Sequence, residues 1–361
     1  MKIVIIGAGV AGLSIGWRLA QAGQEVTILE RAQPGSGATR ASAGMIAVTA
    51  EMGDAHAAEI EFAHYSNGLW PEFAEELEAQ SSRVLDYHRS GALILAADAP
   101  GLARLERRTT NGPKDGLSLL NGPEVREMIP ALTGPVAGAL WAPDEAHVDS
   151  RALGTALGIA FEKAGGKLVI NEAVVRIERR GGRAAIAHTP FGFYAADLFV
   201  LAAGAWSGSL EAGIAPIAPV KGQMILLSPP PGQSPPVPVI WGNGIYAVPR
   251  GGNLLIGATV ENAGFDTQPT DQARDALRGA AERLMPVLKD WTLADHWAGL
   301  RPRSPDGLPL LGPSRVEGLW LASGQYRNGI LYAPAIAASL CGQILGRKEL
   351  IPAFDPRRFK P

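Results

Sequence analysis

The 361-residue sequence predicts an α/β protein that begins with a parallel-sheet unit. Three observations support this. A continuous apolar run at residues 2–7 is typical of a strand buried on both faces. A glycine-rich turn and a stretch with helical periodicity follow it, and a second apolar run at 25–30 ends on an acid. Strands that alternate with helices in this way favour a doubly wound parallel sheet.

The turn at residues 7–12 has the pattern G-x-G-x-x-G. Gly7 permits the tight turn, Gly9 lets backbone amides approach a pyrophosphate, and Gly12 lets the helix pack close to the strand. The amino terminus of the helix then faces the phosphate charge. Glu30 follows Gly12 by 18 residues, where a carboxylate can accept hydrogen bonds from a ribose diol. This order predicts a Rossmann-like unit that binds a dinucleotide.

The loop at residues 35–47 favours FAD over NAD as that dinucleotide. A nicotinamide-binding domain would normally continue into another strand and helix, whereas this loop is rich in glycine and small residues. A flavin needs extra backbone laid along its ribityl chain and ring, and the small residues at 41–44 allow that close approach.

Three later segments continue the pattern. Residues 197–207 read as a buried strand that breaks into a small-residue turn, and 319–324 as another short strand. The helix expected after 325–335 has Pro334 near its first turn, where a missing N–H costs little, and its amino terminus would stabilise a reduced flavin. Residues 271–288 predict an amphipathic surface helix whose apolar positions are Leu277, Ala280, Ala281 and Leu284.

Composition excludes several classes of protein. Hydrophobic residues make up 47% and charged residues 19%, which excludes a disordered chain. A net charge of −2 provides no field for nucleic acid or for an anionic membrane. A single cysteine, Cys341, excludes a disulfide framework and is expected in the core. At about 150 residues per domain, the length predicts two domains.

Neither a secretory signal nor a membrane span is expected. The first uncharged run, at 3–17, contains four glycines and is too short to span a bilayer. We therefore expect a soluble, cytoplasmic protein. Its six histidines are scattered without the spacing of a metal pair, so no metal site is expected.

Several motifs together resemble the D-amino-acid oxidase superfamily of flavoenzymes. Within it, the closing segments look like those of the glycine oxidases, a group associated with the thiazole branch of thiamine synthesis. The resemblance covers essentially the whole chain. The motifs that carry it are residues 7–12, 41–45, 219–223, 246–250, 257–259, 297–309 and 326–331.

This resemblance implies an interwoven, two-domain architecture. A Rossmann-like FAD-binding domain of the glutathione-reductase type would comprise residues 1–82, 147–215 and 299–361. The smaller α+β substrate domain, at 83–146 and 216–298, would contain an antiparallel sheet that roofs the flavin. We also expect a homo-oligomer.

The cofactor implied is FAD, bound without a covalent link. The residues expected to bind it share the glycine turn, the small-residue loop or the turns after later strands. They are Gly7, Gly9, Val10, Ala11, Gly12, Glu30, Arg31, Ala38, Thr39, Ala43, Gly44, Met45, Val174, Gly204, Gln325, Tyr326, Arg327, Asn328, Gly329, Ile330 and Leu331.

The substrate implied is a small amino acid. Arginine matches a carboxylate with a planar fork of two donors, and Arg301 lies in a proline-stiffened stretch that would hold its aim. It matches the family arginine that binds the substrate carboxylate, and Tyr246 matches a tyrosine that adds a hydrogen bond. Arg327 matches a second arginine, which would contact the substrate or support the flavin ring. Met45 and Ala47 match positions that line the pocket.

Two positions depart from the family pattern. Gly244 replaces a histidine found in many glycine oxidases, and Val260 stands where some have methionine. Less bulk at both positions would admit an amine larger than glycine.

The chemistry implied is oxidation of the amino acid to an imine, followed by hydrolysis to an oxo acid and ammonia, with O2 reduced to hydrogen peroxide. A neutral amine needs no general base, because its own lone pair drives the oxidation. Two alternatives stay open: a dehydrogenase that passes electrons to a quinone or carrier protein, and a non-catalytic flavoprotein subunit. Arg301 beside Tyr246 argues against the last of these.

Overall fold

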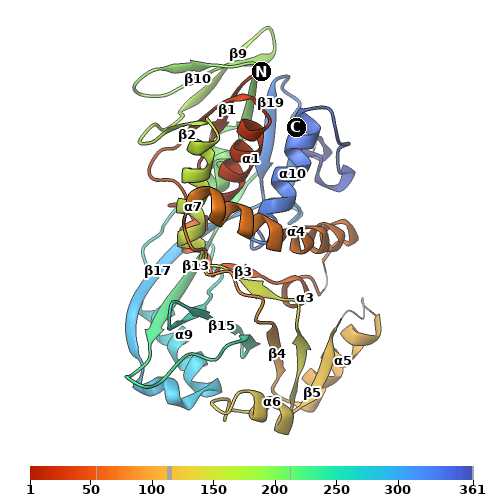
Figure 1. Ribbon diagram of the computed structural model, residues 1–361, viewed down its shortest axis with the longest axis vertical. Helices are drawn as coiled ribbons and strands as arrows, with labels where there is room; N and C mark the ends of the chain where they lie inside the picture. The colour runs from red at the N-terminus through yellow and green to blue at the C-terminus, as the bar shows by residue number, and fades with distance from the viewer. Residues whose placement is uncertain (54, 112–115, 212, 360–361) are drawn as a thin grey trace.

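The computed structural model describes residues 1–361 except 54, 112–115, 212 and 360–361, the last two at the end of the predicted FAD-binding segment. Figure 1 shows two halves, with a parallel sheet above and an antiparallel sheet below. Among the described residues, the helices include none with the length and apolar character needed to cross a membrane.

The parallel sheet is built on the first glycine motif. Its strand order is β18-β19-β12-β1-β2-β8, and every pair is parallel except that of the edge strand β18. The chain order reverses beside β1, and such a switch point opens a crevice at the carboxyl ends of the strands. The strands are β1 (Lys2–Ile6), β2 (Glu25–Leu29), β8 (Lys167–Val169), β12 (Leu198–Leu201), β18 (Leu310–Pro313) and β19 (Leu319–Ser323).

Helices cover one face of this sheet and a small antiparallel sheet covers the other (Figure 1). The apolar first turns of α1 and the whole inner face of α10 are buried, as their small and branched residues require. These helices are α1 (Val10–Gln21), α4 (Ala57–Ser81), α7 (Ser150–Lys163) and α10 (Ala333–Ile344). The small sheet contains β9 (Arg176–Arg180), β10 (Arg183–His188) and β11 (Phe193–Ala195).

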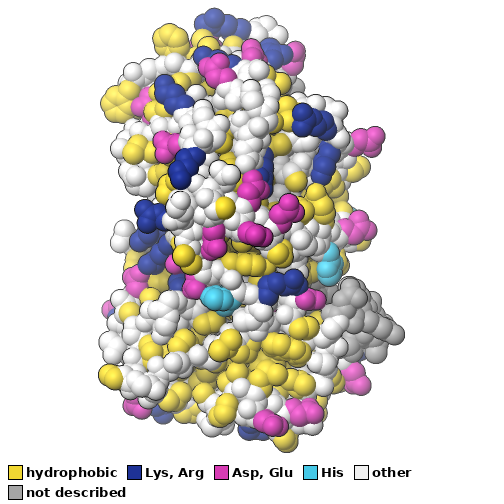
Figure 2. Space-filling model, viewed as in Figure 1, with side chains coloured by type: hydrophobic (Ala, Val, Ile, Leu, Met, Phe, Trp, Pro, Cys, Tyr) yellow, Lys and Arg dark blue, Asp and Glu magenta, His cyan; other side chains and the backbone are white. Residues whose placement is uncertain are grey.

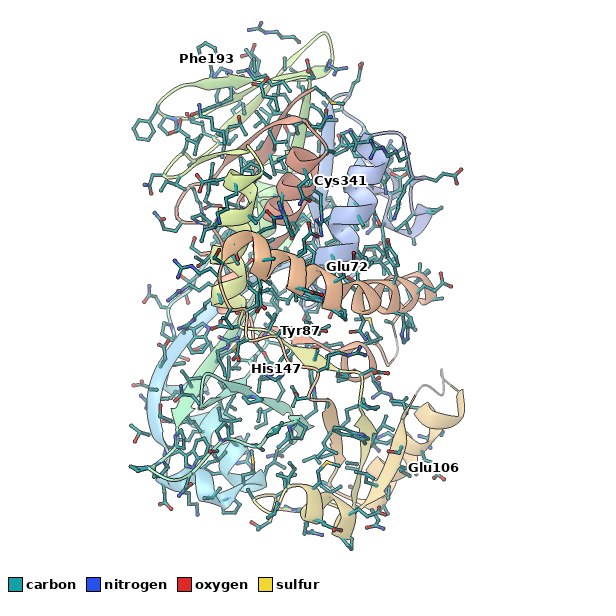
Figure 3. All side chains as sticks on the ribbon, viewed as in Figure 1. Glu72, Tyr87, Glu106, His147, Phe193 and Cys341 are labelled. Carbon is teal, nitrogen blue, oxygen red and sulfur yellow. The ribbon has the colours of Figure 1, made fainter. Side chains whose placement is uncertain are left out.

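Cys341 lies in α10, in the helical layer, as Figure 3 shows. Its thiol donates to the Ile15 carbonyl of α1 at 3.4 Å, and burial raises its pKa to about 12. The prediction that Cys341 belongs to the core is confirmed.

The second large sheet is antiparallel apart from its β14–β4 pair, and its order is β17-β13-β16-β15-β14-β4-β6-β5. Its strands are β4 (Ala92–Ala96), β5 (Ser118–Asn121), β6 (Gly138–Ala142), β13 (Ala218–Ser228), β14 (Val239–Gly242), β15 (Ile245–Arg250), β16 (Asn253–Gly257) and β17 (Thr292–Arg303). It is flanked by α5 (Ala99–Asn111), α6 (Gly122–Met128) and α9 (Asp271–Leu284).

Helix α9 buries Leu277, Ala280, Ala281 and Leu284, so the predicted amphipathic face is confirmed. Strand β17 begins in the predicted substrate-domain segment and ends in a predicted FAD-binding segment, so the predicted boundary at 298/299 falls inside one strand. Strands β13 and β17 are the two longest strands of the described structure, and they pair with each other (Figure 1).

The remaining elements are short. They are α2 (Ala38–Ala41), β3 (Met45–Ile46), α3 (Val48–Glu51), β7 (Ala146–His147) and α8 (Ser207–Leu210), with 3₁₀ turns at Gly204–Trp206, Pro286–Asp290, Pro352–Phe354 and Pro356–Arg358. On the face drawn in Figure 2, charged side chains of both signs are interspersed, and hydrophobic side chains gather over the lower half.

Candidate active site

A cavity of about 810 Å³ runs between the two sheets, from the first glycine turn to β17 and β15. This volume is in the range of ordinary cofactor and ligand pockets. The cavity lies at the carboxyl ends of β1 and β12, where the strand order predicts a binding crevice.

The end of the cavity near β1 is organised by backbone amides. Glu30 follows β2, and its carboxylate accepts hydrogen bonds from the N–H groups of Ala8 at 2.8 Å and Ala32 at 3.0 Å. The Thr39 hydroxyl accepts from Val10 N–H at 2.9 Å and so ties α2 to the start of α1. The glycine turn, the acid and the small-residue loop thus form one unit.

The three motif glycines have different surroundings. A Cβ on Gly12 would overlap the Gly7 carbonyl, and Gly7 has a φ of 107° with Ala202 packed against it. These two glycines permit close packing of the strand, turn and helix. Gly9 lines the cavity, and the nearest atom to a Cβ there would be Thr39 Oγ1 at 3.7 Å. Its open side therefore faces the space where a pyrophosphate would lie.

The small-residue loop is anchored to the antiparallel half. The Arg250 guanidinium on β15 donates to the Ala43 carbonyl at 2.8 Å, and the Trp297 indole on β17 donates to Ala41 O at 3.1 Å. Gly44 has a φ of 78° and leaves no room for a Cβ against the Val148 carbonyl. The loop is therefore a fixed wall of the cavity.

This end of the cavity fits FAD. The N-cap of α1 is Gly9, which has no side chain, and Gly9 and Ala11 line the cavity, so the amino terminus of the helix faces the space where an anionic pyrophosphate would lie. The guanidinium of Arg31 stacks over Trp206 at 3.4 Å. Gln325 Nε2 is buried without a hydrogen-bond partner among the described residues, and this donor lies in the cavity wall. A dinucleotide with a polar ring system would satisfy these groups.

The other end of the cavity contains Arg301, on β17. Its Nη1 donates to the carbonyls of Thr259 at 3.1 Å and Lys221 at 3.3 Å, which fixes the plane of the guanidinium. A Cβ on Gly222, in the paired strand β13, would overlap that guanidinium. Gly222 therefore makes the space that Arg301 occupies.

Tyr246 lies on β15 beside Arg301. Its ring occupies the space over Gly257, and its hydroxyl lies 3.8 Å from the sulfur of Met224. Burial raises the pKa of this hydroxyl, and the Arg301 guanidinium partly offsets the rise through its charge and a hydrogen bond. The phenol is thus a neutral donor beside a permanent cation.

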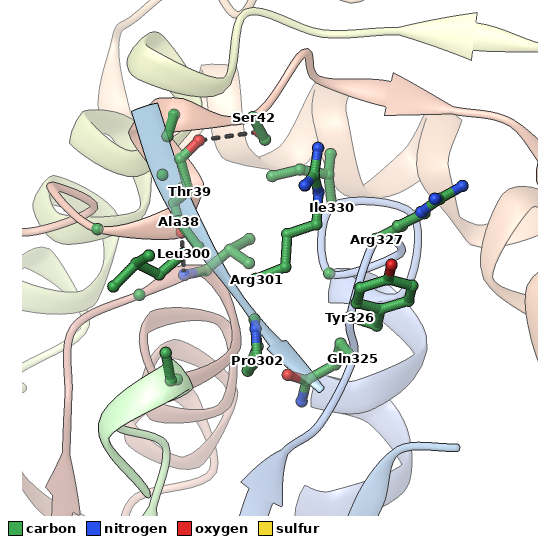
Figure 4. Close-up of a pocket in the computed structure, with 18 of the residues that line it drawn as sticks. Ala38, Thr39, Ser42, Leu300, Arg301, Pro302, Gln325, Tyr326, Arg327 and Ile330 are labelled. Atoms are coloured by element: carbon green, nitrogen blue, oxygen red, sulfur yellow. Dashed lines mark hydrogen bonds between the residues drawn. The ribbon is translucent and has the colours of Figure 1, made fainter. Parts of the chain in front are cut away.

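Arg327 approaches from the loop after β19. Tyr326 N–H donates to the Pro302 carbonyl of β17 at 2.9 Å, and Tyr326 has a φ of 47°. Figure 4 shows this loop beside the strand that carries Leu300, Arg301 and Pro302. The pairing brings Arg327 into the same cavity wall as Arg301.

An acid that the sequence did not predict, Glu51, completes this end. It is the last residue of α3, and its Oε2 lies 3.9 Å from Arg327 Nη1. Burial raises the pKa of the carboxyl, although Arg327 and Arg301 act to lower it. Only its position four residues after Ala47, in the segment that leaves the small-residue loop, could have drawn attention to it.

The two departures from the family pattern have different structural settings. Asn243 and Gly244 form the two-residue turn between β14 and β15, with φ values of 54° and 76°. Positive φ at both positions is the geometry of a type I′ hairpin turn, which favours Asn-Gly. Val260 is 55% exposed at the mouth of the cavity.

Two predicted cofactor residues do not line the cavity: Gly12, which packs against Gly7, and Leu331, whose carbonyl accepts from Ser66 and Trp70. The other predicted residues all lie in its wall. They are Gly7, Gly9, Val10, Ala11, Glu30, Arg31, Ala38, Thr39, Ala43, Gly44, Met45, Ala47, Val174, Gly204, Gly244, Tyr246, Val260, Arg301, Gln325, Tyr326, Arg327, Asn328, Gly329 and Ile330.

Within the described part of the chain, His, Cys, Asp and Glu side chains form no group of three that could hold a metal ion. The fold and the cavity define a dinucleotide-binding flavoprotein with a charged pocket at the far end of its cofactor site. The sequence model of the family described as FAD dependent oxidoreductase matches residues 2–342. The chain belongs to this family, and FAD is its cofactor.

Individual relatives are similar over the whole chain. A glycine oxidase from Pseudomonas aeruginosa is 34% identical, with 100% of this chain and 98% of the relative covered. A bifunctional protein ThiO/ThiG from Synechocystis sp. is 37% identical over 99% of this chain, which spans only 54% of that longer protein. The crystal structure of glycine oxidase from Geobacillus kaustophilus matches with a TM-score of 0.92 and 31% identity, covering 100% of this chain and 99% of that one.

Proposed function

We propose that the protein oxidises a small amino acid, such as glycine, sarcosine or a small D-amino acid, to its imine. The observation that carries this proposal is the convergence of Arg301 and Tyr246 on one cavity with the dinucleotide-binding turn. The relatives named glycine oxidase support the same substrate class. Bound FAD supplies the acceptor for the two electrons removed from the substrate.

The chain's own residues bind and orient the substrate. Arg301 presents a planar guanidinium whose plane is held by two carbonyls, and it forms a charge-assisted pair with the substrate carboxylate. The neutral Tyr246 hydroxyl donates a further hydrogen bond to that carboxylate. Arg327 adds positive charge at the same end. The imine then hydrolyses to an oxo acid and ammonia.

Substrate size follows from the cavity mouth. Gly244 adds no side chain there, and Val260 is short and largely exposed. These positions leave room for a substituent on the nitrogen or on Cα. We therefore propose that amines larger than glycine are accepted.

An anaerobic titration of the purified yellow protein tests this function. We expect glycine, sarcosine, D-alanine, D-proline or a larger amine to bleach the flavin, and at least one larger amine to do so faster than glycine. A protein that takes up FAD but is bleached by none of them would contradict the proposed activity. Fastest turnover with glycine would contradict only the proposed substrate size.

The electron acceptor needs a separate measurement. We propose O2, with formation of hydrogen peroxide, in a homo-oligomeric protein. Peroxide formed in a one-to-one ratio with substrate in air is the expected result. Rapid anaerobic bleaching with little peroxide in air would instead support a dehydrogenase that serves a quinone or a carrier protein.

A further inference from the structure

The cavity wall contains three acids among the described residues: Glu30, Glu51 and Glu172. The first accepts two backbone N–H bonds, and Glu172 accepts from the hydroxyls of Thr189 at 2.6 Å and Tyr194 at 3.3 Å. No described residue donates a hydrogen bond to Glu51, and the cation nearest to it is Arg327 at 3.9 Å. Glu51 is thus the acid in this wall whose hydrogen-bonding capacity is left for a ligand.

Glu51 is held in place by a dedicated contact. Glu145, which is 3% exposed, accepts hydrogen bonds from Thr49 N–H and from Ala50 N–H at 3.1 Å. The Arg108 guanidinium donates to the Thr49 carbonyl. These contacts hold the short helix α3 from both sides, so its last residue has a defined position in the wall.

Charged groups on several elements face this carboxylate. Arg301 comes from β17 and Arg327 from the loop after β19, and both favour its ionised form. Glu59 on α4 opposes ionisation, as does burial, which raises the pKa of Glu51. Three further groups have their pKa raised by its charge: Glu145, Tyr246 and Tyr332. These opposing effects leave the Glu51 carboxylate able to accept a proton from a cationic group beside it.

An amino acid in its ordinary form bears a carboxylate and an ammonium group separated by one carbon. Arg301 and Tyr246 complement the carboxylate. Glu51 lies in the same cavity wall, near enough to Arg301 to complement the ammonium group of the same substrate. We propose that Glu51 binds the ammonium group of the substrate and accepts one proton from it before oxidation. This inference rests on the proposed function and adds a catalytic residue to it.

The proton transfer balances without another reactant. One N–H bond of the ammonium group breaks, and its proton forms an O–H bond on the Glu51 carboxylate. The electron pair of that bond stays on nitrogen, where it becomes the lone pair that drives loss of hydrogen from Cα. Burial disfavours both charged groups and so favours the transfer, whereas Arg301 and Arg327 lower the pKa of the ammonium group and of Glu51 alike.

The test uses the FAD-loaded protein, the variant E51Q and a pair of matched ligands. Glycolate has a hydroxyl where glycine has an ammonium group and is otherwise nearly the same shape. We expect E51Q to bind glycolate within about twofold of the wild-type dissociation constant, followed through the visible spectrum of the flavin. We expect its kcat/KM for the best amino acid to fall by about 100-fold, which is the size of a lost charge-assisted contact.

The pH profile provides a second readout. In the wild type, kcat/KM should fall as the pH falls through the pKa of Glu51, because only its carboxylate accepts the proton. E51Q should lose this acidic limb. The matched control is E59Q, since Glu59 accepts from Tyr332 at 2.9 Å and lies outside the cavity wall. E59Q should retain the limb, displaced to lower pH because the charge of Glu59 opposes ionisation of Glu51, and should keep the wild-type kinetics at pH values above it.

Three results with E51Q would overturn the inference, and a fourth, with the wild type, would contradict the proposed function. Equal loss of glycolate and amino-acid binding in E51Q would assign the residue a structural role. Unchanged kinetics with the amino acid, or an unchanged acidic limb, would remove it from the reaction. A wild-type protein whose flavin no amino acid reduces would contradict the proposed function itself.

Discussion

The two ends of the cavity are built in different ways. At the dinucleotide end, the glycine turn, Glu30 and Thr39 come from one stretch, residues 7–39, and are tied together by hydrogen bonds such as Ala8 N–H to Glu30. Only a few groups, such as Trp206 and Gln325, join them from later turns. At the substrate end, side chains come from α3, β15, β17 and the loop after β19. A local motif therefore specifies the cofactor, whereas the pairing of distant strands specifies the substrate.

Removal of Arg301 should have the largest effect on the substrate end while leaving the dinucleotide end nearly unchanged. In R301A the substrate carboxylate loses its charged partner, and we expect kcat/KM to fall by about 1,000-fold. The affinity for FAD should change little, because the cofactor groups belong to the other end. Stopped-flow reduction and flavin titration measure the two quantities.

The variant R301K keeps the charge but loses the planar fork, so an intermediate loss is expected. If R301A lowered FAD affinity as much as it lowered kcat/KM, the two ends would not be independent.

The dinucleotide end could be predicted from the sequence more completely than the substrate end. The strand, turn, helix and acid at residues 2–30 are local, and the structure has them in the predicted order. Glu51 could not be found in this way, because α3 is one turn long and is held by Glu145, 95 residues away along the chain. The turn at Gly244 was within reach, since Asn-Gly between two apolar runs is a local signal for a hairpin.

Glu145 holds α3 at the substrate end of the cavity, and its ionisation makes the stability of the protein depend on pH. Burial raises the pKa of this carboxyl to about 7, above the ordinary value of 4.5. The folded state thus binds a proton that the unfolded state releases, so this contribution to stability is full below about pH 4.5 and is lost as the pH rises through about 7. Glutamine cannot ionise, so E145Q should not show this loss.

We expect the Tm of E145Q relative to wild type to rise by about 5 °C between about pH 5 and pH 8.5. The buried His147, at the junction of the halves in Figure 3, has its pKa lowered to about 4 by burial and acts in the opposite direction in acid. Because both proteins contain His147, the difference in Tm between E145Q and wild type does not include the contribution of that histidine. A Tm difference that is constant with pH would show that Glu145 does not titrate in this range.

Gly222 tests the cross-strand pairing directly. A Cβ there would overlap the end of the Arg301 side chain, which is flexible, so G222A should fold while its guanidinium is displaced. We expect KM to rise by about 30-fold, somewhat less than the loss in R301A. The control is G68A on α4, where a Cβ meets no atom within 4 Å.

G68A should show wild-type kinetics and a gain in stability of up to about 1 kcal/mol from its helical position. Wild-type KM in G222A would mean that Arg301 does not need the position seen in the structure.

Gly9 gives the smallest expected effect and the clearest test of the dinucleotide end. Because a Cβ there would meet only Thr39 Oγ1, at 3.7 Å, the protein itself has room for alanine. The methyl group would instead occupy space that the pyrophosphate needs, so G9A should weaken FAD binding by about tenfold without lowering Tm of the flavin-free protein. The control is G192A, in the turn between β10 and β11, where a Cβ has no atom within 4 Å. Equal FAD affinity in G9A and G192A would mean that the cofactor does not approach this turn. The cofactor specificity would then have to come from the loop at 38–45 rather than from the glycine motif.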